Sequence, residues 1–478
     1  MARRFVFELF PRVFSLIIFR SKSQFNVNAA VCNSQNEIKN KISTLFVPGR
    51  HGGNIYQIVK PVIDINFISD NILEIKRSCD LRGVEFDPEH TLDVIKVWSH
   101  LKNRYQEMVE KDEEFGKELE RLQSLDLETE IKETTQKRIA LSQNLRLEKE
   151  KLYDVEDIVM PKLQKIPNLI DAATPTQFDT VDICQKSTDF EFKFFSHAEL
   201  GKLMSLLEFS NNDPTVYYMK GKLSELELAT QIYFSDKLIS LSYAPLSCVD
   251  FCKSFIIEAI GRDPHSVDDC IPLKSKSSRE SGQKLNLVGG ASLEMFCAYL
   301  TNMNVDKSSF PLKYYSLGRR YDARNRINSQ DLFSVVQSTN IHSVILCDQN
   351  GENEEFSAFF NSVLLCYQAL GLPYRTVDIA AKNLTITESR RKQLELWSPS
   401  FKTYVPVAHV SQHNNFLSKR LHITYGIQHS VEGYCSIVDG IVVNIPVLIA
   451  CIMENFQTKN YSFEIPAVLK EIMDNLYA

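Results

Sequence analysis

Residues 438–457 read VDGIVVNIPVLIACIMENFQ, and this stretch decides how the C-terminal half of the chain is interpreted. A glycine opens it, a strand-like apolar run follows, and an apolar helix ends at Glu454 and Asn455. No residue between Asp439 and Glu454 is charged. A strand–turn–helix unit of this kind usually meets a ligand, and a ligand site usually includes charged side chains. Because this unit has none, the pattern predicts that it packs in a core and does not bind a ligand through charged groups.

The whole chain has 478 residues, which is enough for a large core and for two or three domains. Its 44% hydrophobic and 24% charged residues are typical of a soluble globular protein. The formal net charge of -6 gives no general attraction to nucleic acid, so such binding would need a local basic surface. Eleven cysteines lie scattered without CxxC pairs or zinc spacing, which indicates reduced thiols in an intracellular compartment.

The first residues, MARRFVFELFPRVFSLIIFRSKSQ, interleave basic residues with aromatic and aliphatic ones and contain one acid, Glu8. This is typical of a mitochondrial presequence, and Pro11 and Arg12 interrupt the apolar core that a secretory signal would need. The apolar run at residues 13–19 is too short to span a bilayer, and no other segment reads as transmembrane. The sequence therefore predicts a presequence over residues 1–30 and a protein of the mitochondrial matrix.

The most regular part of the chain follows a small helical module that begins near residue 60. Its seam alternates steps of four and three residues: Leu101, Tyr105, Met108, Asp112, Phe115, Leu119 and Leu122. A short turn and a second helix from about residue 128 to 155 come next, and Pro161 and Pro167 are expected to close it. Two long helices joined by a short turn predict an antiparallel coiled-coil hairpin within a module of residues 60–165.

The outer faces of this predicted arm hold nine candidate RNA-binding cations among many acids: Lys102, Arg104, Lys117, Lys132, Lys137, Arg138, Arg146, Lys149 and Lys151. One interpretation is a solvated coiled-coil surface. The other is an arm whose lysines and arginines follow a nucleic-acid backbone. The sequence leaves both open, because the acids dilute the positive charge.

From about residue 175 the chain changes to short apolar runs, aromatic-rich strands and a few amphipathic helices, without βαβ periodicity. Runs such as HSVILC, YVPVAHVS and IVDGIVVNI read as strands. Antiparallel strands with flanking helices predict an α+β domain over residues 175–478.

The order of these parts, together with several local phrases, resembles seryl-tRNA synthetase, a class II aminoacyl-tRNA synthetase. The phrases are VYYMKG (216–221), FPLKY (310–314), CYQALGLPYR (366–375), SKRLHI (418–423) and MENFQ (453–457). The resemblance covers nearly everything after residue 60. It implies an antiparallel sheet flanked by helices, a dimer built through residues 221–250, and a hairpin that reaches toward tRNA.

The resemblance also implies where ATP and serine should be held, and this chain departs from the family there. The arginine of the third class II motif aligns with Val447, next to Pro446. In the second motif, Asp322 stands at the arginine, and a shifted alignment would recover Arg320. The serine-recognition phrase aligns with residues 290–292, so that Gly290 and Ser292 replace its threonine and glutamate, and the metal-binding glutamate aligns with Pro406.

Losing one preorganised donor to a developing charge typically costs ~3–4 kcal/mol of transition-state stabilisation. Several such losses together predict no serine activation, no ATP binding, no cofactor and no metal. Glu294 could replace the lost carboxylate or be a helix-surface acid, and the second interpretation is favoured. His409 and His413 have the spacing of a helical metal pair, but ordinary core or polar histidines are favoured in a strand-to-turn segment.

Three functions follow from the sequence. The first is a catalytically inactive mitochondrial paralogue, most similar to the noncatalytic seryl-tRNA synthetase-like proteins of insect mitochondria. It would bind tRNA, with tRNA-Ser expected, and pair with a second copy or with the mitochondrial seryl-tRNA synthetase. The second is a divergent but active mitochondrial serine–tRNA ligase. The third is a protein-only scaffold that no longer binds nucleic acid.

Overall fold

The computed structural model describes residues 43–45, 59, 61–183, 192–266, 268–273, 284–324, 330–427 and 430–476. The predicted presequence lies outside these residues. All contacts described below belong to the unit that begins at Thr44 and runs to the C-terminus.

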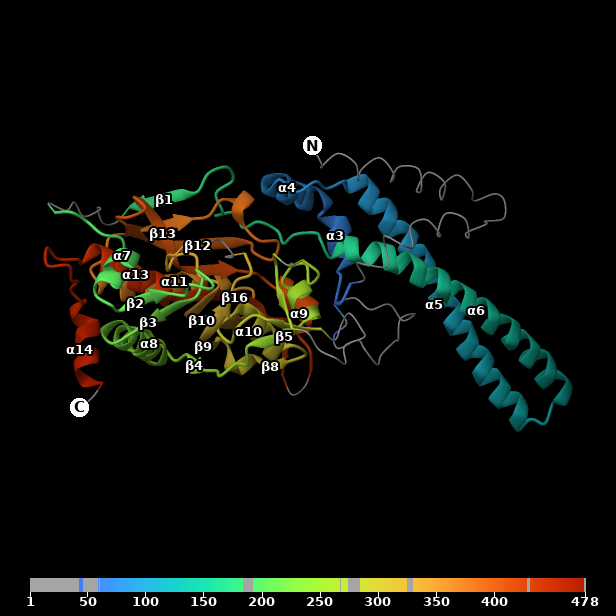
Figure 1. Ribbon diagram of the computed structural model, residues 1–478. Helices are drawn as coiled ribbons and strands as arrows, with labels where there is room; N and C mark the ends of the chain where they lie inside the picture. The colour runs from blue at the N-terminus through green and yellow to red at the C-terminus, as the bar shows by residue number, and fades with distance from the viewer. Residues whose placement is uncertain are drawn as a thin grey trace. The chain divides into compact units, whose positions relative to one another are not determined.

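The N-terminal module consists of two short helices, α3 (Ile65–Asp70) and α4 (Ile72–Arg82), followed by the long pair α5 (Pro88–Ser124) and α6 (Glu128–Leu163) (Figure 1). The carboxylate of Asp87 caps α5 by accepting from the backbone N–H of His90 at 3.0 Å, and Pro88 fits the first turn because no N–H is needed there. Helix α6 continues eight residues beyond the expected end at 155. Pro161 lies inside its last turn, where the missing N–H removes one hydrogen bond to the carbonyl four residues earlier, and the helix ends two residues later.

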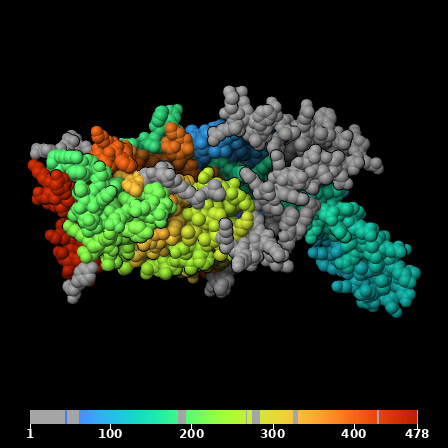
Figure 2. Space-filling view, viewed as in Figure 1, coloured from blue at the N-terminus to red at the C-terminus, as the bar shows by residue number. Residues whose placement is uncertain are grey.

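Helices α5 and α6 pack antiparallel, which confirms the predicted hairpin, and together they present one continuous surface (Figure 2). Near the base of the hairpin Val94, Ile95, Trp98, Leu152 and Val159 are buried. Farther along, from residue 99 to 121 of α5, no side chain is buried. A hairpin of two helices covers each seam from one side only, so the distal seam stays half exposed.

The second module is built on an eight-stranded sheet with the order β1-β11-β12-β13-β16-β10-β9-β4. Its strands are β1 (Thr180–Ile183), β4 (Ala244–Pro245), β9 (Leu312–Tyr321), β10 (Gln337–Cys347), β11 (Tyr374–Asp378), β12 (Arg390–Ser398), β13 (Thr403–Gln412) and β16 (Ser436–Asn444). Every neighbouring pair is antiparallel except β4 with β9. The expected α+β domain with an antiparallel sheet is therefore confirmed.

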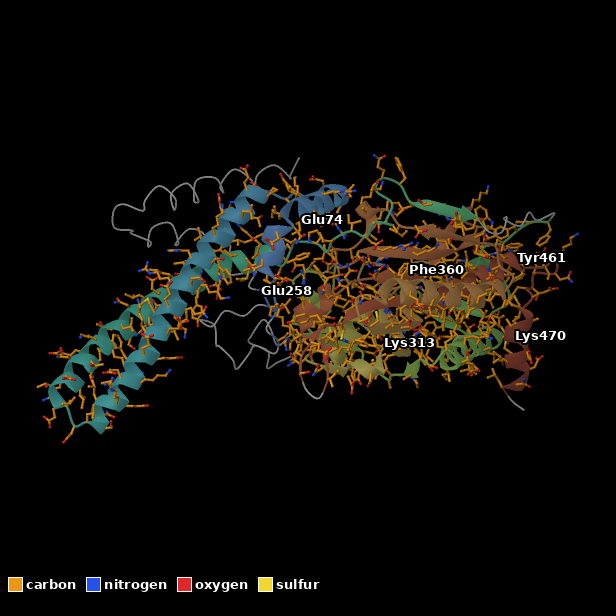
Figure 3. The ribbon with its side chains drawn as sticks, turned by 180° about the vertical axis from the view of Figure 1, so that it is seen from behind. Glu74, Glu258, Lys313, Phe360, Tyr461 and Lys470 are labelled. Atoms are coloured by element: carbon orange, nitrogen blue, oxygen red, sulfur yellow. The ribbon has the colours of Figure 1, made fainter. Side chains whose placement is uncertain are left out.

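Helices cover both faces of the sheet. The main core packs one face against α7 (His197–Leu203), α8 (Lys222–Ser240), α11 (Glu352–Gln368), α13 (Ile445–Asn455) and α14 (Ala467–Asn475). A smaller core packs the opposite face against α9 (Ser254–Ala259), α10 (Leu293–Leu300) and α12 (Phe416–Leu421). Between the sheet and the helices of the main core, Lys313 of β9 forms an ion pair with Glu355 of α11 at 2.7 Å. Figure 3 labels Lys313 and also Phe360, which belongs to the same helix as Glu355.

Short strands complete the module. They form β2 (Leu207–Phe209) with β3 (Tyr217–Met219), the set β5 (Phe251–Lys253), β7 (Leu285–Leu287) and β6 (Ile271–Pro272), and the set β15 (Gly433–Tyr434), β14 (Thr424–Gly426) and β8 (Asn304–Asp306). Single 3-10 turns lie at Lys307–Ser309 and Ala381–Asn383. No helix in the described part of the chain is both long and apolar enough to cross a bilayer.

Residues 438–457 form strand β16 and helix α13 as predicted, and all residues of α13 are buried. Gly440 lies where a Cβ atom would overlap the backbone carbonyl of His409 and contact the ring of Phe359. The glycine therefore serves strand packing. Pro446 lies in the first turn of α13, where its missing N–H costs no helical bond.

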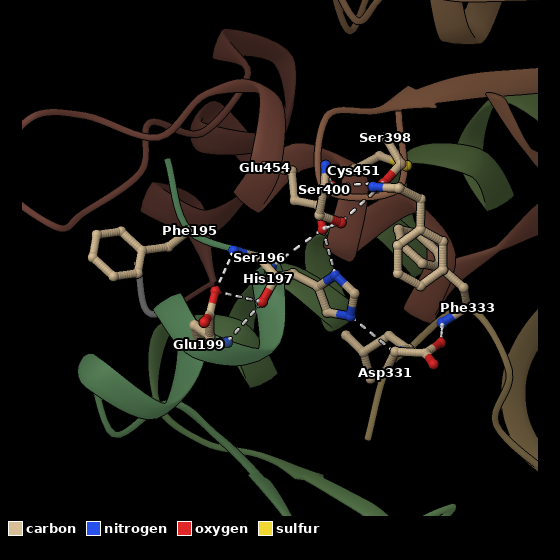
Figure 4. Close-up of polar contacts among 12 residues, drawn as sticks. Phe195, Ser196, His197, Glu199, Asp331, Phe333, Ser398, Ser400, Cys451 and Glu454 are labelled. Carbon is tan, nitrogen blue, oxygen red and sulfur yellow. Dashed lines mark hydrogen bonds and ion pairs between the residues drawn. The ribbon is translucent and has the colours of Figure 1, made fainter. Parts of the chain in front are cut away.

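The buried carboxylate of Glu454, near the end of α13, joins four segments (Figure 4). It accepts from Nδ1 of His197 at 2.6 Å and from the hydroxyl groups of Ser398 at 2.8 Å and Ser400 at 2.6 Å. The other ring nitrogen, Nε2 of His197, accepts from the backbone N–H of Leu332 at 3.0 Å, so the proton on this ring lies on Nδ1. This network holds α7 and the segment before β10 against α13.

Two buried arginines join the helical module to the sheet module. The guanidinium of Arg82, on α4, donates to the carbonyl oxygens of Thr385, Asn168 and Glu388. Arg420, on α12, donates to the carbonyl oxygens of Ala259 and Gln164. The side chain of Asn168 also donates to the carbonyls of Thr387 and His413.

Candidate functional site

The candidate site is the sheet face that packs toward α9, α10 and α12. Because successive strand residues point to opposite faces, Arg320 of β9, Asn340 and His342 of β10, and Asp439 of β16 share this face. Ser411 joins them from β13, because it pairs with Asp439 across the ladder. This face therefore carries a cluster of polar side chains beside its smaller apolar core, whereas the opposite face carries the main core.

Asp439 is the central acid of this face. Its two carboxylate oxygens accept from Nε2 of His413 at 2.6 Å and from Nε2 of His342 at 2.8 Å, and all three side chains are buried. Burial alone would raise the pKa of Asp439, but the hydrogen bonds from both histidines hold that pKa well below its usual range. Burial would lower the pKa of His413, and the partnership with Asp439 raises it instead.

His409 does not join this cluster as a ligand. Burial, reinforced by the charge of Arg391, lowers its pKa to about 3, so the ring is neutral at physiological pH. His413 is a core histidine bonded to Asp439, in agreement with the favoured sequence interpretation. Among the residues that the structure describes, no group of three His, Cys, Asp or Glu side chains could hold a metal ion.

A second buried acid, Glu388, lies beside this cluster. It pairs with the guanidinium of Arg391, accepts from the Ser411 hydroxyl at 2.7 Å, and accepts from the backbone N–H of Thr385 at 2.8 Å. Burial would raise the pKa of Glu388, but Arg391, His413 and these hydrogen bonds lower it to about 2.

The same face contains buried polar atoms without a hydrogen-bond partner in the described chain. They are both side-chain atoms of Asn340, the hydroxyl of Ser316 and Nδ1 of His342. A buried polar atom left unpaired costs about 1–3 kcal/mol. The face therefore retains unused hydrogen-bonding groups although the residues expected to hold ATP and serine are replaced.

The segment aligned with serine recognition closes onto β9. The N–H of Ala291 donates to the carbonyl of Arg319 at 3.1 Å, and a Cβ atom on Gly289, whose φ is +91°, would overlap that carbonyl. Gly290 donates to the Asp250 carboxylate at 2.8 Å, and the Ser292 hydroxyl donates to the carbonyl of Gly289 at 2.7 Å. The polar groups of this segment are thus used within the protein.

Glu294 corrects one expectation from the sequence, because it is not a helix-surface acid. Its side chain is 5% exposed and accepts from Nη1 of Arg262 at 2.8 Å. Burial would raise the pKa of Glu294, and the charges of Arg262 and Arg320 lower it. The position of Glu294 on its helix could not reveal Arg262 as its partner, because Arg262 lies 32 residues away along the chain.

Asp322 and Arg320 differ in how they are paired. Asp322 forms an ion pair with Arg324 at 2.9 Å. The guanidinium of Arg320 forms no hydrogen bond or ion pair with any described residue, although the charge of Glu294 acts on it. Burial lowers the pKa of Arg320.

The remaining replaced positions lie apart from this segment. Val447 is 3% exposed and belongs to the main core on the α13 side of the sheet. Pro406 is exposed on β13, opposite Glu395 of β12, and β13 is separated from β9 by β16 and β10. The structure therefore brings Gly290, Ser292 and the end of β9 together, and places Val447 and Pro406 elsewhere.

The nine cations of the hairpin fall into two groups. Six have partners: Arg104 and Lys151 pair with Glu148, Arg138 with Asp112, Arg146 with Glu150, and Lys102 and Lys149 lie over the rings of Trp98 and Tyr153. Lys117, Lys132 and Lys137 are exposed and form no ion pair with the described residues. All three lie in the distal half of the hairpin.

Comparisons with known proteins agree with this architecture. The tRNA synthetase class II core domain (G, H, P, S and T) matches residues 285–456. A serine–tRNA ligase of Methanocorpusculum labreanum is 26% identical over 330 residues, which are 66% of this chain and 75% of that protein. The serine–tRNA synthetase-like protein Slimp of Drosophila melanogaster is 24% identical over 391 residues, 80% of this chain and 82% of that protein.

Solved structures show the same fold at low identity. The cytoplasmic serine–tRNA ligase of Naegleria fowleri in complex with AMP has a TM-score of 0.68 at 18% identity and covers 86% of this chain and 97% of its own. The seryl-tRNA synthetase of Pyrococcus horikoshii complexed with ATP has a TM-score of 0.72 at 16% identity and covers 86% of this chain and 98% of its own.

The low pKa of Glu388 predicts how stability depends on acid. A carboxyl whose pKa is about 2 when folded and 4.5 when unfolded contributes stability above pH 4.5 that is lost as the pH falls toward 2. The substitution Glu388→Gln is expected to lower the free energy of unfolding at pH 7 by roughly 3 kcal/mol and to remove this acid dependence. Urea unfolding from pH 2 to 7 measures both effects. The exposed Glu74→Gln on α4 is the control, and identical curves for the two variants would contradict the prediction.

Proposed function

This chain contains a class II tRNA synthetase core domain and is a homologue of the seryl-tRNA ligases and of Slimp, and we propose that it is a noncatalytic member that works in mitochondria. It binds tRNA, with tRNA-Ser expected, through the distal half of the α5–α6 hairpin. It also dimerises through α8 and β4. It neither activates serine nor binds ATP.

The observation that carries this proposal is the fate of the positions expected to hold the substrates. Val447 is sealed in an apolar core, so no cation at the start of α13 meets a phosphate. The Ser292 hydroxyl is used by its own loop, and Pro406 offers no carboxylate for a metal. Each lost group removes on the order of 3–4 kcal/mol of transition-state stabilisation, and valine cannot replace the bidentate fork of a guanidinium.

ATP binding tests the proposal without assuming a reaction. Calorimetric titration of the full chain with ATP and Mg²⁺ is expected to give no heat of binding at millimolar nucleotide. Serine-dependent ATP–pyrophosphate exchange is expected to stay at the level of a sample without protein. A catalytically active seryl-tRNA synthetase assayed in parallel shows that the conditions support both signals. Exchange that depends on serine and is abolished by Arg320→Ala would overturn the proposal.

One observation favours the alternative of a divergent but active serine–tRNA ligase. The Arg320 guanidinium lies beside Glu294 without a hydrogen bond or ion pair to any described residue, and such a cation could bind an anionic substrate. The alternative requires this one arginine to replace the contributions of several lost groups. The exchange assay separates the two functions.

The hairpin supports RNA binding at three positions. Lys117, Lys132 and Lys137 are exposed cations without ion-pair partners among described residues, so they can meet phosphate groups without breaking an existing contact. The ion pairs of Arg104, Arg138, Arg146 and Lys151 compete with such binding.

Replacing the three lysines together by glutamine is expected to weaken tRNA binding and to lower the slope of log K against log salt by about two, because each phosphate contact contributes roughly 0.7–0.9. Filter binding between 50 and 300 mM salt, on the order of the cellular range, measures the slope. The matched control replaces the exposed Lys402, Lys459 and Lys470 of the sheet module, which changes the net charge equally. Equal effects of the two triple variants would show that the hairpin does not contact RNA.

Dimerisation is supported by apolar side chains that α8 and the turn before β4 leave in solvent. Leu228, Ile239 and Leu241 are 46%, 53% and 42% exposed. Strand β4 is also an edge of the eight-stranded sheet, with its outer backbone groups unpaired by any other strand of the sheet. Apolar groups beside an open strand edge suit a second copy or the mitochondrial seryl-tRNA synthetase.

Light scattering of the purified chain is expected to give the mass of a dimer, and Ile239→Lys is expected to shift it to the monomer, because a lysine ammonium would be buried without a partner. Leu73→Lys, at a 79% exposed position on α4, is the control that should leave the mass unchanged. Affinity capture from mitochondria tells the two partners apart. A monomeric chain that captures neither a second copy nor the synthetase would remove this part of the proposal.

A further inference from the structure

A cleft of about 580 Å³ lies at the ends of strands β9 and β10. Its walls are residues 212–217 at the start of β3, Ile271 of β6, and Tyr321, Val336 and Gln337 at the ends of β9 and β10. Tyr321 follows Arg320 in the same strand, so the two side chains point to opposite faces of the sheet. The side chains of Tyr321 and Gln337 in the cleft therefore point away from the sheet face that carries Arg320.

Two walls of the cleft are aromatic. Gln337 is paired with Tyr321 across the β9–β10 ladder, so these two side chains share a face. Tyr217 stands on a third segment, β3, and its hydroxyl is buried without a hydrogen-bond partner. The rings of Tyr321 and Tyr217 therefore give the cleft two aromatic walls from different segments.

The polar groups of the cleft are neutral amides and hydroxyls. The side-chain amides of Asn212 and Gln337 form no hydrogen bond within the described chain. Each amide offers a donor and an acceptor from one group, which is the pattern that pairs with the edge of a nucleobase. Asp213, the one acid among the described residues of the lining, already accepts from the N–H and the hydroxyl of Thr215 at 2.9 and 2.7 Å.

The charge of the cleft excludes some ligands and favours others. None of the described residues that line it is a lysine or an arginine, so these residues offer no charged donor to a phosphate. Flat aromatic faces favour a planar ring, and amide side chains favour a ring with donors and acceptors on its edge. The volume lies within the usual range of small-ligand sites.

We infer that this cleft binds an uncharged nucleobase, stacked on Tyr321 and read by the amides of Asn212 and Gln337. The base can come from a free nucleoside or from an unpaired nucleotide of RNA, because both present the same ring. The inference goes beyond tRNA binding by the hairpin and does not depend on it.

The test titrates the full chain with adenosine, cytidine, guanosine and uridine, followed by ligand-observed NMR, with ribose as a sugar that lacks the base. At least one nucleoside is expected to bind and ribose is not. Tyr321→Ala is expected to weaken that nucleoside roughly 5- to 150-fold, the effect of removing one base-stacking aromatic ring. Gln337→Leu is expected to weaken it as well and to change the preference among the four bases.

Tyr218→Ala is the matched control, because Tyr218 is the neighbouring tyrosine of β3, is 56% exposed and does not line the cleft. Arg320→Ala, on the opposite sheet face, is also expected to leave nucleoside binding unchanged. A short unpaired oligonucleotide that binds more tightly than the nucleoside, and loses this gain in Tyr321→Ala, identifies RNA as the source. Equal affinities identify the free nucleoside.

The inference is overturned if no nucleoside binds, if ribose binds equally well, if Tyr321→Ala and Tyr218→Ala behave alike, or if Arg320→Ala abolishes binding. The variant in which Lys117, Lys132 and Lys137 are replaced by glutamine distinguishes a failure of this inference from a failure of the proposed function. It is expected to reduce tRNA binding and to leave nucleoside binding intact.

Discussion

The complete burial of helix α13 beneath the sheet constrains the rest of the sheet module. Its eleven residues contact the main core, and Gly440 lets β16 approach β13 closely enough to hold that helix in place. Burying this apolar helix is favourable, at roughly 25 cal/mol for each Å² of apolar surface removed from water. The same burial leaves no room for a charged group at Val447, because an unpaired guanidinium in an apolar core would be strongly destabilising. The packing of α13 and the lack of a charged group at Val447 therefore have one physical cause.

Three buried acids organise the remaining contacts of this module. Glu454 joins α13 to α7 and to the end of β12, Asp439 joins β16 to two histidines, and Glu388 joins the loop before β12 to β13. Each carboxylate has partners from segments far apart in the sequence, which is how a buried charge becomes tolerable. The carbonyl of Glu388 also accepts from Arg82, so the helical module is bonded to the same loop that stabilises the sheet face.

Much of the fold was accessible from the sequence. The step pattern from Leu101 to Leu122 predicts the hairpin, because a heptad seam depends only on local periodicity. Residues 438–457 predict β16 and α13 for the same reason, since an apolar run beside a glycine and a proline has few other structures. The end of α6 was predicted too early, because the helix continues through Pro161 at the cost of one N–H bond and ends only at Leu163. The replacements at Val447, Ser292 and Pro406 were also inferred from the sequence, because that inference depends only on which residue stands at each position.

The sequence by itself determined the element types, the order of the modules and the absence of particular charged residues at Val447, Ser292 and Pro406. These properties depend on local spacing or on which side chain is present. Only the tertiary structure decided that Glu294 is buried against Arg262, that six of the nine hairpin cations have partners, and that an aromatic cleft lies at the ends of β9 and β10. Those properties depend on pairs of residues from distant segments, and no local pattern specifies which distant side chain will fill the space beside a given charge.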